Sequence, residues 1–149
     1  MEKRAIIAFY KGWSSHPLKM LKHAGIRLFC LSKYSHCEFV IEQTEMFGKS
    51  MCWSASSKRG VTKEHIQICH KDWDILEVAV PLKECIERFQ KIEGAKYSYI
   101  GAIVASVYCI SKSRSKRWFC SEAVYFALTG QRHRIGVKAL YKHLSKLAT

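Results

Sequence analysis

Trp118-Phe119-Cys120-Ser121-Glu122-Ala123-Val124 is the stretch that decides the fold, because it opens an apolar helix on a cysteine. A basic, serine-rich segment, 111–117, precedes it, and Gly130 is placed to end the helix that follows. In a first helical turn, the unpaired backbone N–H groups and the positive end of the helix dipole favour an anion. Such a position can lower the pKa of the Cys120 thiol and favour the nucleophilic thiolate. From this segment alone, a buried core cysteine is an equal alternative.

A second polar stretch lies far upstream, at Tyr34-Ser35-His36-Cys37-Glu38-Phe39-Val40-Ile41. Its β-branched and aromatic residues predict a strand. The two-residue period of a strand puts His36 and Glu38 on one face and turns Cys37 to the other. A carboxylate beside a histidine can orient the ring and make it a better base. With Cys120, these residues supply the parts of a Cys-His-Glu triad, although the strand taken alone fits a half-exposed polar face better.

Ser-His-Cys-Glu-Phe-Val-Ile at 35–41 and Trp-Phe-Cys-Ser-Glu-Ala-Val at 118–124 resemble the permuted NlpC/P60 (papain-like) superfamily, above all small YiiX/YebB-like proteins of bacteria and phages. In the usual papain order the cysteine helix comes first, whereas here, as in the permuted group, the histidine strand precedes it. The resemblance implies an α+β, circularly permuted papain-like fold with an antiparallel, barrel-like sheet and packed helices. Weaker likenesses lie at 9–12, 53–56, 60–61, 73–74 and 94–97.

The same resemblance implies a role for each site residue. Cys120 would attack the carbonyl of an amide or ester, His36 would take and return the proton, and Glu38 would hold the ring. Tyr97 would line the substrate pocket by its family position, although many relatives have Tyr-Asp where this chain has Tyr97-Ser98. Related families cleave peptidoglycan peptides or transfer and remove lipid acyl groups. The expected substrate is therefore a peptide, a peptidoglycan-like peptide or a lipid acyl group, with no cofactor and no metal.

Composition predicts one folded domain over residues 1–149. The hydrophobic share is 48% and there are only two prolines, as in a globular chain. Seven cysteines, an odd number without a Cys-x-x-Cys pair, make a poor disulfide framework and favour a reducing compartment. The apolar run at 5–9 is too short for a secretory signal. The expected location is the cytoplasm, or the host cytoplasm if a phage encodes the chain.

The formal net charge of +13 predicts an anionic partner, such as nucleic acid, lipid headgroups or cell-wall polymers. Residues 111–149 carry nine Lys or Arg residues against one acid, Glu122. Such a region is more often a solvated face than a recognition site, and no nucleic-acid motif accompanies it. The apolar stretch 100–110 has about half the length that spans a bilayer, so at most peripheral membrane contact is expected.

Strands predicted near one another, followed by helices, indicate an α+β domain. The strands are expected at 4–10, 36–42, 49–55, 64–69 and 74–80. Helices are expected from about 14 to 31, from Pro81 to Ile92, over 97–110, from Cys120, and over 137–147.

Other kinds of site and function are weighed against the triad. Cys69-His70 lacks zinc-ligand spacing, and Ser54-Ala55-Ser56 lacks the elbow of a serine nucleophile. A papain-like fold kept as a non-catalytic phage or bacterial binding module is the main alternative, and an intact triad counts against it. A peripheral lipid-modifying enzyme that uses the basic region at an anionic membrane is the third.

Overall fold

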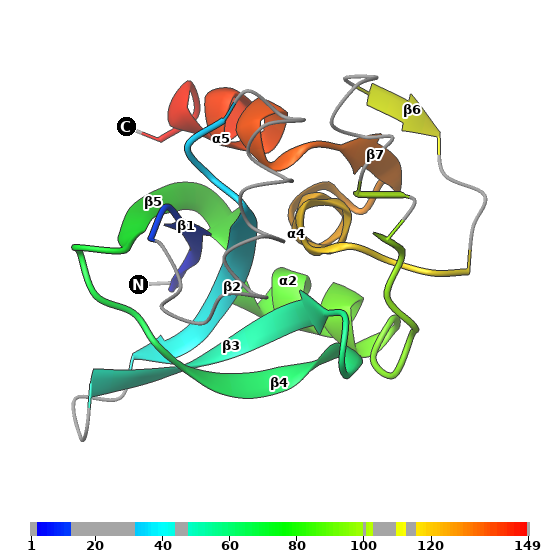
Figure 1. The fold of residues 1–149 in the computed structure, drawn as a ribbon, viewed down its shortest axis with the longest axis horizontal. Helices are drawn as coiled ribbons and strands as arrows, with labels where there is room; N and C mark the ends of the chain where they lie inside the picture. Colours follow the sequence, from blue (N-terminus) through cyan, green and yellow to red (C-terminus); the bar gives the residue numbers. More distant parts are fainter. Residues whose placement is uncertain are drawn as a thin grey trace.

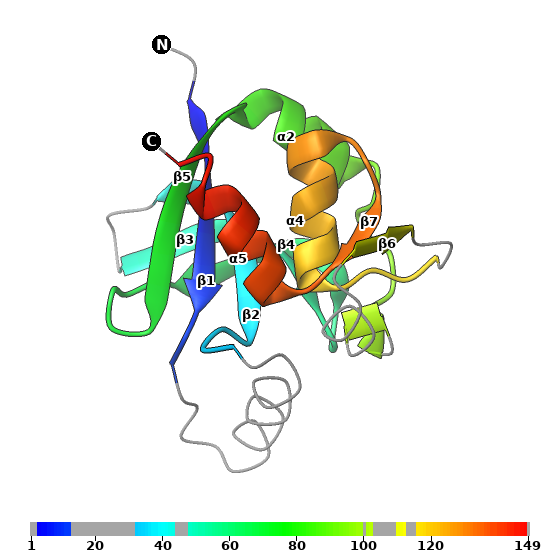
Figure 2. The ribbon, with the colours of Figure 1, turned by 90° about the horizontal axis from the view of Figure 1, so that it is seen from above.

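The computed structural model describes residues 3–12, 32–43, 48–99, 101–102, 110–112 and 116–148. The main strands are β1 (Arg4–Tyr10), β2 (His36–Gln43), β3 (Lys49–Ser56), β4 (Gly60–Gln67) and β5 (Trp73–Pro81), and the helices are α2 (Leu82–Gln90), α4 (Cys120–Thr129) and α5 (Val137–Ser145). The five strands form one antiparallel sheet in the order β4-β3-β2-β1-β5. All three helices cover one face of this sheet (Figure 1, Figure 2). The α+β prediction is therefore confirmed.

The expectation of a barrel-like sheet is wrong, because the described sheet is open. Its edges are β4 and β5, and no described pairing joins them. The strand β5 returns to pair with β1, with Ala8 opposite Ile75, on the side of the sheet away from β4. With β4 at one edge and β5 at the other, this five-stranded sheet does not close on itself. Small closed barrels have about eight strands.

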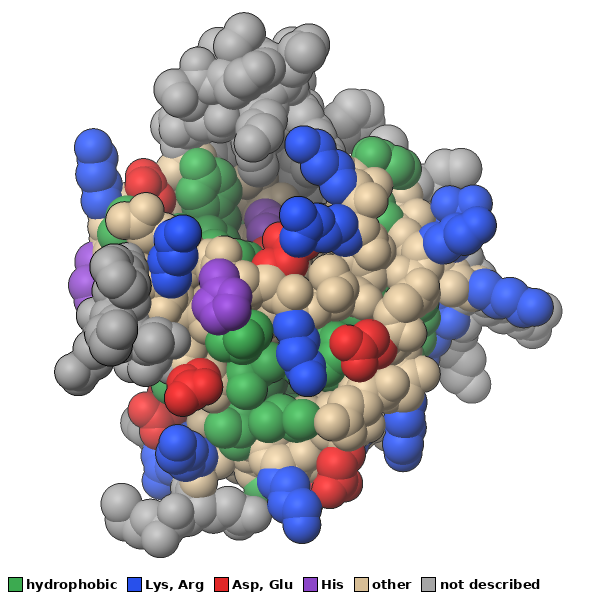
Figure 3. Space-filling model, turned by 90° about the horizontal axis from the view of Figure 1, so that it is seen from below, with side chains coloured by type: hydrophobic (Ala, Val, Ile, Leu, Met, Phe, Trp, Pro, Cys, Tyr) green, Lys and Arg blue, Asp and Glu red, His purple; other side chains and the backbone are tan. Residues whose placement is uncertain are grey.

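Alternating side chains divide the sheet into two unequal faces. Toward the helices, Phe39 and Trp53 pack against Phe89 of α2, with ring centroids 5.2 and 5.3 Å apart. The opposite face carries a smaller buried cluster of Ala8, Val40, Cys52 and Trp73. Figure 3 shows hydrophobic side chains gathered on that face, with lysine and arginine side chains around them. The larger core, between the sheet and the helices, is the one that receives the cysteine helix.

The helix α4 begins and ends where the sequence predicts. Phe119 precedes it with an extended backbone (φ −123°, ψ 167°), and Gly130 ends it with a left-handed one (φ 72°, ψ 0°). The N–H of Gly130 donates to the carbonyl of Phe126, which satisfies one of the last carbonyl groups. Seven of its residues are buried, including all of the first five, so its start lies inside the protein.

A short second sheet pairs β6 (Ile110–Lys112) with β7 (His133–Ile135). The helix predicted over 97–110 is therefore wrong at its end, because Ile110 is in a strand. Strands of three residues show no period, so their pairing cannot be predicted from local sequence. Residues 103–109 and the whole of the helix expected at 14–31 lie outside the described residues. The predicted strand at 64–69 begins earlier, at Gly60, after the turn 57–59.

Gly60 marks a close approach between the start of β4 and the loop after α2. Its φ is +71°, and a Cβ atom there would lie 2.1 Å from the carbonyl oxygen of Ala95. Gly94 has a similar φ of +81°, but a Cβ there would meet no described atom within 4 Å. We expect Gly60→Ala to lower the free energy of unfolding by about 2–3 kcal/mol and Gly94→Ala by only about 1 kcal/mol in urea denaturation. Equal losses would contradict the importance of the contact with Ala95.

Candidate active site

His36 and Glu38 form an ion pair through Nε2 and Oε1, as the strand period predicts. His36 is the first residue of β2, opposite Tyr10 of β1. The neighbouring strand β3 supplies Ser54, whose Oγ donates to Glu38 Oε1 at 3.0 Å. The carboxylate thus links a ring nitrogen on one strand to a hydroxyl on the next, which orients the imidazole.

Glu38 is more deeply placed than a half-exposed strand face would allow, since it is only 2% exposed. Burial raises the pKa of its carboxyl, while the positive charge of His36 and the hydrogen bonds from His36 and Ser54 oppose that rise. Its second oxygen, Oε2, is buried and finds no partner among the described residues. A carboxylate with so little solvation depends on His36 to remain charged.

Cys120 is the first residue of α4 and is 4% exposed. Phe119, the residue before it, makes no side-chain hydrogen bond to this end of the helix. The first N–H groups of a helix have no partner within the helix itself. The helix packs directly against β2 in the larger core. Cys120 therefore lies at the helix–sheet contact, next to the strand that carries the histidine.

The structure brings Cys120 within hydrogen-bonding reach of His36. The pKa of the Cys120 thiol is held well below its ordinary value, first by a hydrogen bond from Cys37 and then by the charge of His36, although burial acts to raise it. Burial lowers the pKa of His36, but the negative charges of Cys120 and Glu38 outweigh burial and leave that pKa well above its ordinary value. Both shifts favour a thiolate–imidazolium pair at neutral pH.

Cys37 is the residue of this site that sequence reasoning missed. It lies in the helix-side core, as the period predicts, and that is where α4 arrives. Hydrogen bonding from its thiol and from its backbone N–H is among the causes that lower the pKa of the Cys120 thiol. Burial, together with its bond to Cys120, raises the pKa of the Cys37 thiol, so Cys37 stays a neutral donor. No local signal in the strand could reveal this role, because it depends on which helix packs there.

Tyr97, the residue predicted to line the substrate pocket, lies close enough to Cys120 to be affected by its charge. It forms an isolated bridge with Trp118, which precedes the cysteine by two residues. Burial raises the pKa of the Tyr97 hydroxyl, and the negative charge of Cys120 adds to that effect. Tyr97 also lines a pocket at the surface. Tyr97 is therefore both within range of the Cys120 charge and part of the wall of a surface pocket.

A buried ion pair holds the start of α4 in place. Glu122 is 1% exposed, and its Oε1 accepts from Nε of Arg132 at 2.9 Å. The guanidinium of Arg132 also lies 3.8 Å from the ring centroid of Trp118 and donates to the backbone oxygen of Arg117 at 2.7 Å. These contacts join the segment before Cys120 to its first helical turn. Arg132 is thus structural, although it belongs to the basic region, 111–149, that the sequence indicates only as a possible site for an anionic partner.

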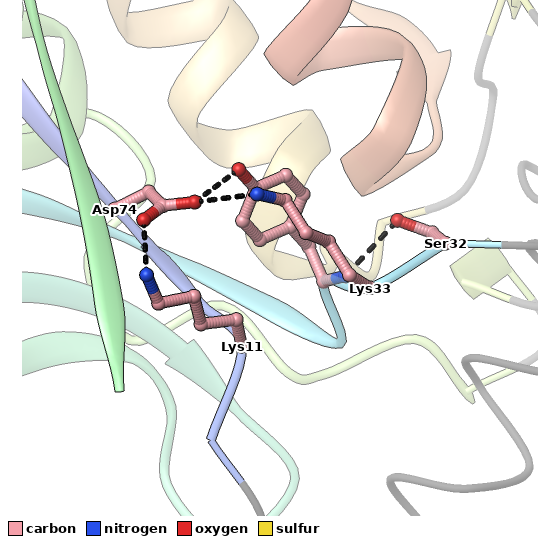
Figure 4. A network of polar contacts seen from close by, with 5 residues as sticks. Lys11, Ser32, Lys33 and Asp74 are labelled. Carbon is pink, nitrogen blue, oxygen red and sulfur yellow. Dashed lines mark hydrogen bonds and ion pairs between the residues drawn. The ribbon is translucent and has the colours of Figure 1, made fainter. Parts of the chain in front are cut away.

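A second polar network, around Asp74 of β5, fixes the segment that enters β2 (Figure 4). Asp74 accepts from Lys11 Nζ at 2.5 Å, from Lys33 Nζ at 2.9 Å and from Tyr34 Oη at 2.5 Å. Burial alone would raise the pKa of Asp74, but these three donors hold it below its ordinary value. Because Tyr34 precedes His36 by two residues, the network anchors the approach to the histidine.

Other kinds of site find little support in the described part of the chain. No three His, Cys, Asp or Glu residues there are grouped so as to hold a metal ion. None of the described helices is long and apolar enough to cross a membrane. Comparison with known proteins adds no relative: no family model matches the chain, and no curated protein matches its sequence.

Proposed function

We propose that this protein is a cysteine-dependent hydrolase or acyltransferase of the permuted papain-like (NlpC/P60) type, acting on an amide or ester bond. One observation carries the proposal: the helix-start thiol of Cys120 lies within hydrogen-bonding reach of His36, and His36 is paired with the buried Glu38. A nucleophile, a base and a group that orients the base are the general requirements of covalent acyl transfer. A purely binding protein needs none of them.

The reaction begins from the thiolate–imidazolium pair. Because Glu38 engages Nε2 of His36, the other ring nitrogen, Nδ1, holds the proton taken from the Cys120 thiol. The thiolate then attacks the carbonyl carbon and a C–S bond forms. The backbone N–H of Cys120, at the start of α4, is placed to donate to the developing oxyanion.

Collapse of the tetrahedral intermediate breaks the bond to the leaving amine or alcohol, which takes the proton from His36 Nδ1. This leaves a thioester on Cys120. In hydrolysis, His36 then removes a proton from water, which attacks the thioester and releases the acid. In acyl transfer, a second alcohol or amine takes the place of that water.

Acyl-enzyme trapping tests the proposal. Wild-type protein is mixed with p-nitrophenyl acetate, quenched in acid within the first turnover, and mapped by mass spectrometry. We expect acetyl groups on Cys120 together with a burst of p-nitrophenol. Cys69→Ala serves as the control, because it removes a half-buried thiol outside the site and should leave both signals unchanged. Acetylation confined to lysines or to other cysteines would contradict the proposal.

Glu38→Gln should lower kcat/KM by about 10–100-fold and still allow folding. The amide oxygen can keep accepting from Ser54, but the variant loses the negative charge that supports the imidazolium. We expect the free energy of unfolding in urea to change by less than about 1 kcal/mol. The variant loses the ion pair with His36, but it also loses the cost of burying a charged carboxylate. Glu42→Gln, an exposed change on the same strand, is the matched control. An unfolded Glu38→Gln protein would mark Glu38 as structural.

A further inference from the structure

A pocket of about 280 Å³ lies beside the candidate active site, where three segments meet. These are the turn 57–59 between β3 and β4, the loop 94–99 after α2, and the segment 116–118 that leads into Cys120. Figure 1 shows the turn and the loop side by side, and backbone hydrogen bonds of 2.8 and 2.9 Å join Val61 to Gly94 and Ala95. The pocket is thus built from segments tied to one another.

The wall of the pocket is also tied to the cysteine helix. The N–H of Trp118 donates to the carbonyl of Lys96 at 2.8 Å, and the N–H of Ser98 donates back to Trp118 at 2.8 Å. Tyr97, between those two residues, lines the pocket and feels the charge of Cys120. The wall of the pocket is therefore joined by backbone hydrogen bonds to the segment that leads into Cys120.

Four cationic side chains line this pocket: Lys58, Arg59, Lys96 and Arg117. No acid is among its described lining residues. One carboxylate, that of Glu64, lies outside the lining at 3.9 Å from Arg59 Nε. Arg117 Nη1 contacts the carbonyl of Tyr97 at 3.4 Å, which directs the guanidinium toward the loop. Positive charges gathered in one concave site repel each other, and a bound anion relieves that repulsion.

We propose that this pocket is a subsite that binds an anionic group, a phosphate or a carboxylate, on the acyl substrate. The inference rests on the proposed function, because it assigns the pocket to the substrate of Cys120. Arginine binds such anions through paired N–H donors, and lysine adds point charges. The Tyr97 and Tyr99 rings supply an apolar wall next to the charges. Only Arg117 of this set belongs to the basic region, 111–149, that the sequence pointed to.

Equilibrium binding of phenyl phosphate tests the subsite without any need for turnover. The test variant is Lys58→Gln/Lys96→Gln, which changes two exposed side chains of the pocket. The control variant is Lys83→Gln/Lys142→Gln, which removes the same net charge from exposed positions on α2 and α5. By isothermal titration calorimetry we expect the test variant to bind roughly 10-fold more weakly than wild type, and the control variant less than about 2-fold.

Equal weakening in both variants would overturn the subsite, since net charge alone would then explain the binding. A wild type that binds neither phenyl phosphate nor benzoate would overturn it as well. Benzoate and benzyl alcohol complete the series. Binding of either anion supports the subsite and tells whether the substrate carries a phosphate or a carboxylate, whereas equally tight binding of neutral benzyl alcohol would overturn it. Thermal melting of each variant confirms that it is folded.

Alkylation of Cys120 separates this inference from the proposed function. Iodoacetate and iodoacetamide differ chiefly in charge. The rate of alkylation of Cys120 by iodoacetate is divided by its rate with iodoacetamide, and this ratio is divided by the same ratio for a small free thiol. The result reports the local preference for an anion. We expect that ratio to favour iodoacetate in the wild type and to fall several-fold in Lys58→Gln/Lys96→Gln, but not in the control variant. Phenyl phosphate that binds to a protein whose Cys120 is inert would reject the proposed function alone. If Cys120 is reactive but shows no preference for iodoacetate, and the protein does not bind phenyl phosphate, the subsite alone is rejected.

Discussion

Replacing Cys120 by alanine should reduce the hydrolysis of p-nitrophenyl acetate by at least about 10⁴-fold, to the level of general ester breakdown on the protein surface. The other described thiols cannot take over, because Cys69 lies outside the site and the remaining three are held neutral. Burial raises the pKa of the Cys52 thiol. It also raises the pKa of the Cys85 thiol, to about 11. Cys37 is held as a neutral thiol beside the site. The loss should therefore fall almost entirely on kcat.

The fold should survive this change, since alanine fills most of the volume of cysteine. Cys69→Ala, which also removes one thiol, is the matched control and should keep wild-type turnover. The measurement is steady-state kcat and KM for both variants, with urea denaturation to compare stability. A Cys120→Ala protein that retains half of the wild-type rate would exclude Cys120 as the nucleophile.

His36→Ala should reduce kcat/KM by roughly 10³-fold, because general acid–base catalysis contributes about 10²–10⁴-fold. The same variant should slow alkylation of Cys120 by iodoacetamide at neutral pH. In the wild type the thiol pKa lies well below its ordinary value, partly through the charge of His36. Removing that charge raises the thiol pKa, so the acid limb of the alkylation profile moves to higher pH. The hydrogen bond from Cys37 remains, which keeps the shift incomplete.

His65→Ala is the control for this second prediction, because His65 is an exposed histidine on β4. The measurement is the alkylation rate of each cysteine between acid and alkaline pH, followed by mass spectrometry. Cys120 should be labelled first in the wild type. If Cys69 reacts first, or if His36→Ala leaves the pH profile of Cys120 unchanged, the thiolate–imidazolium pair is not the resting state of the site.

Elements with local signals were predicted correctly from the residues alone. Alternating apolar residues predicted β1, β2, β3 and β5 to within about two residues. The apolar run from Cys120 to Gly130 predicted α4 together with its ends. The same two-residue period placed His36 and Glu38 on one face of β2, because neighbouring side chains on a strand are positioned by the backbone alone.

Which of these elements contact one another is visible only in the folded protein. The pairing of β5 with β1 leaves the sheet open, and the packing of α4 on β2 puts Cys37 beside Cys120. The hydroxyl of Ser54 reaches Glu38 from another strand, and the cationic pocket gathers three separate segments. Periodicity reports the direction of a side chain relative to its own backbone, whereas such contacts depend on which distant segments bury the most apolar surface together.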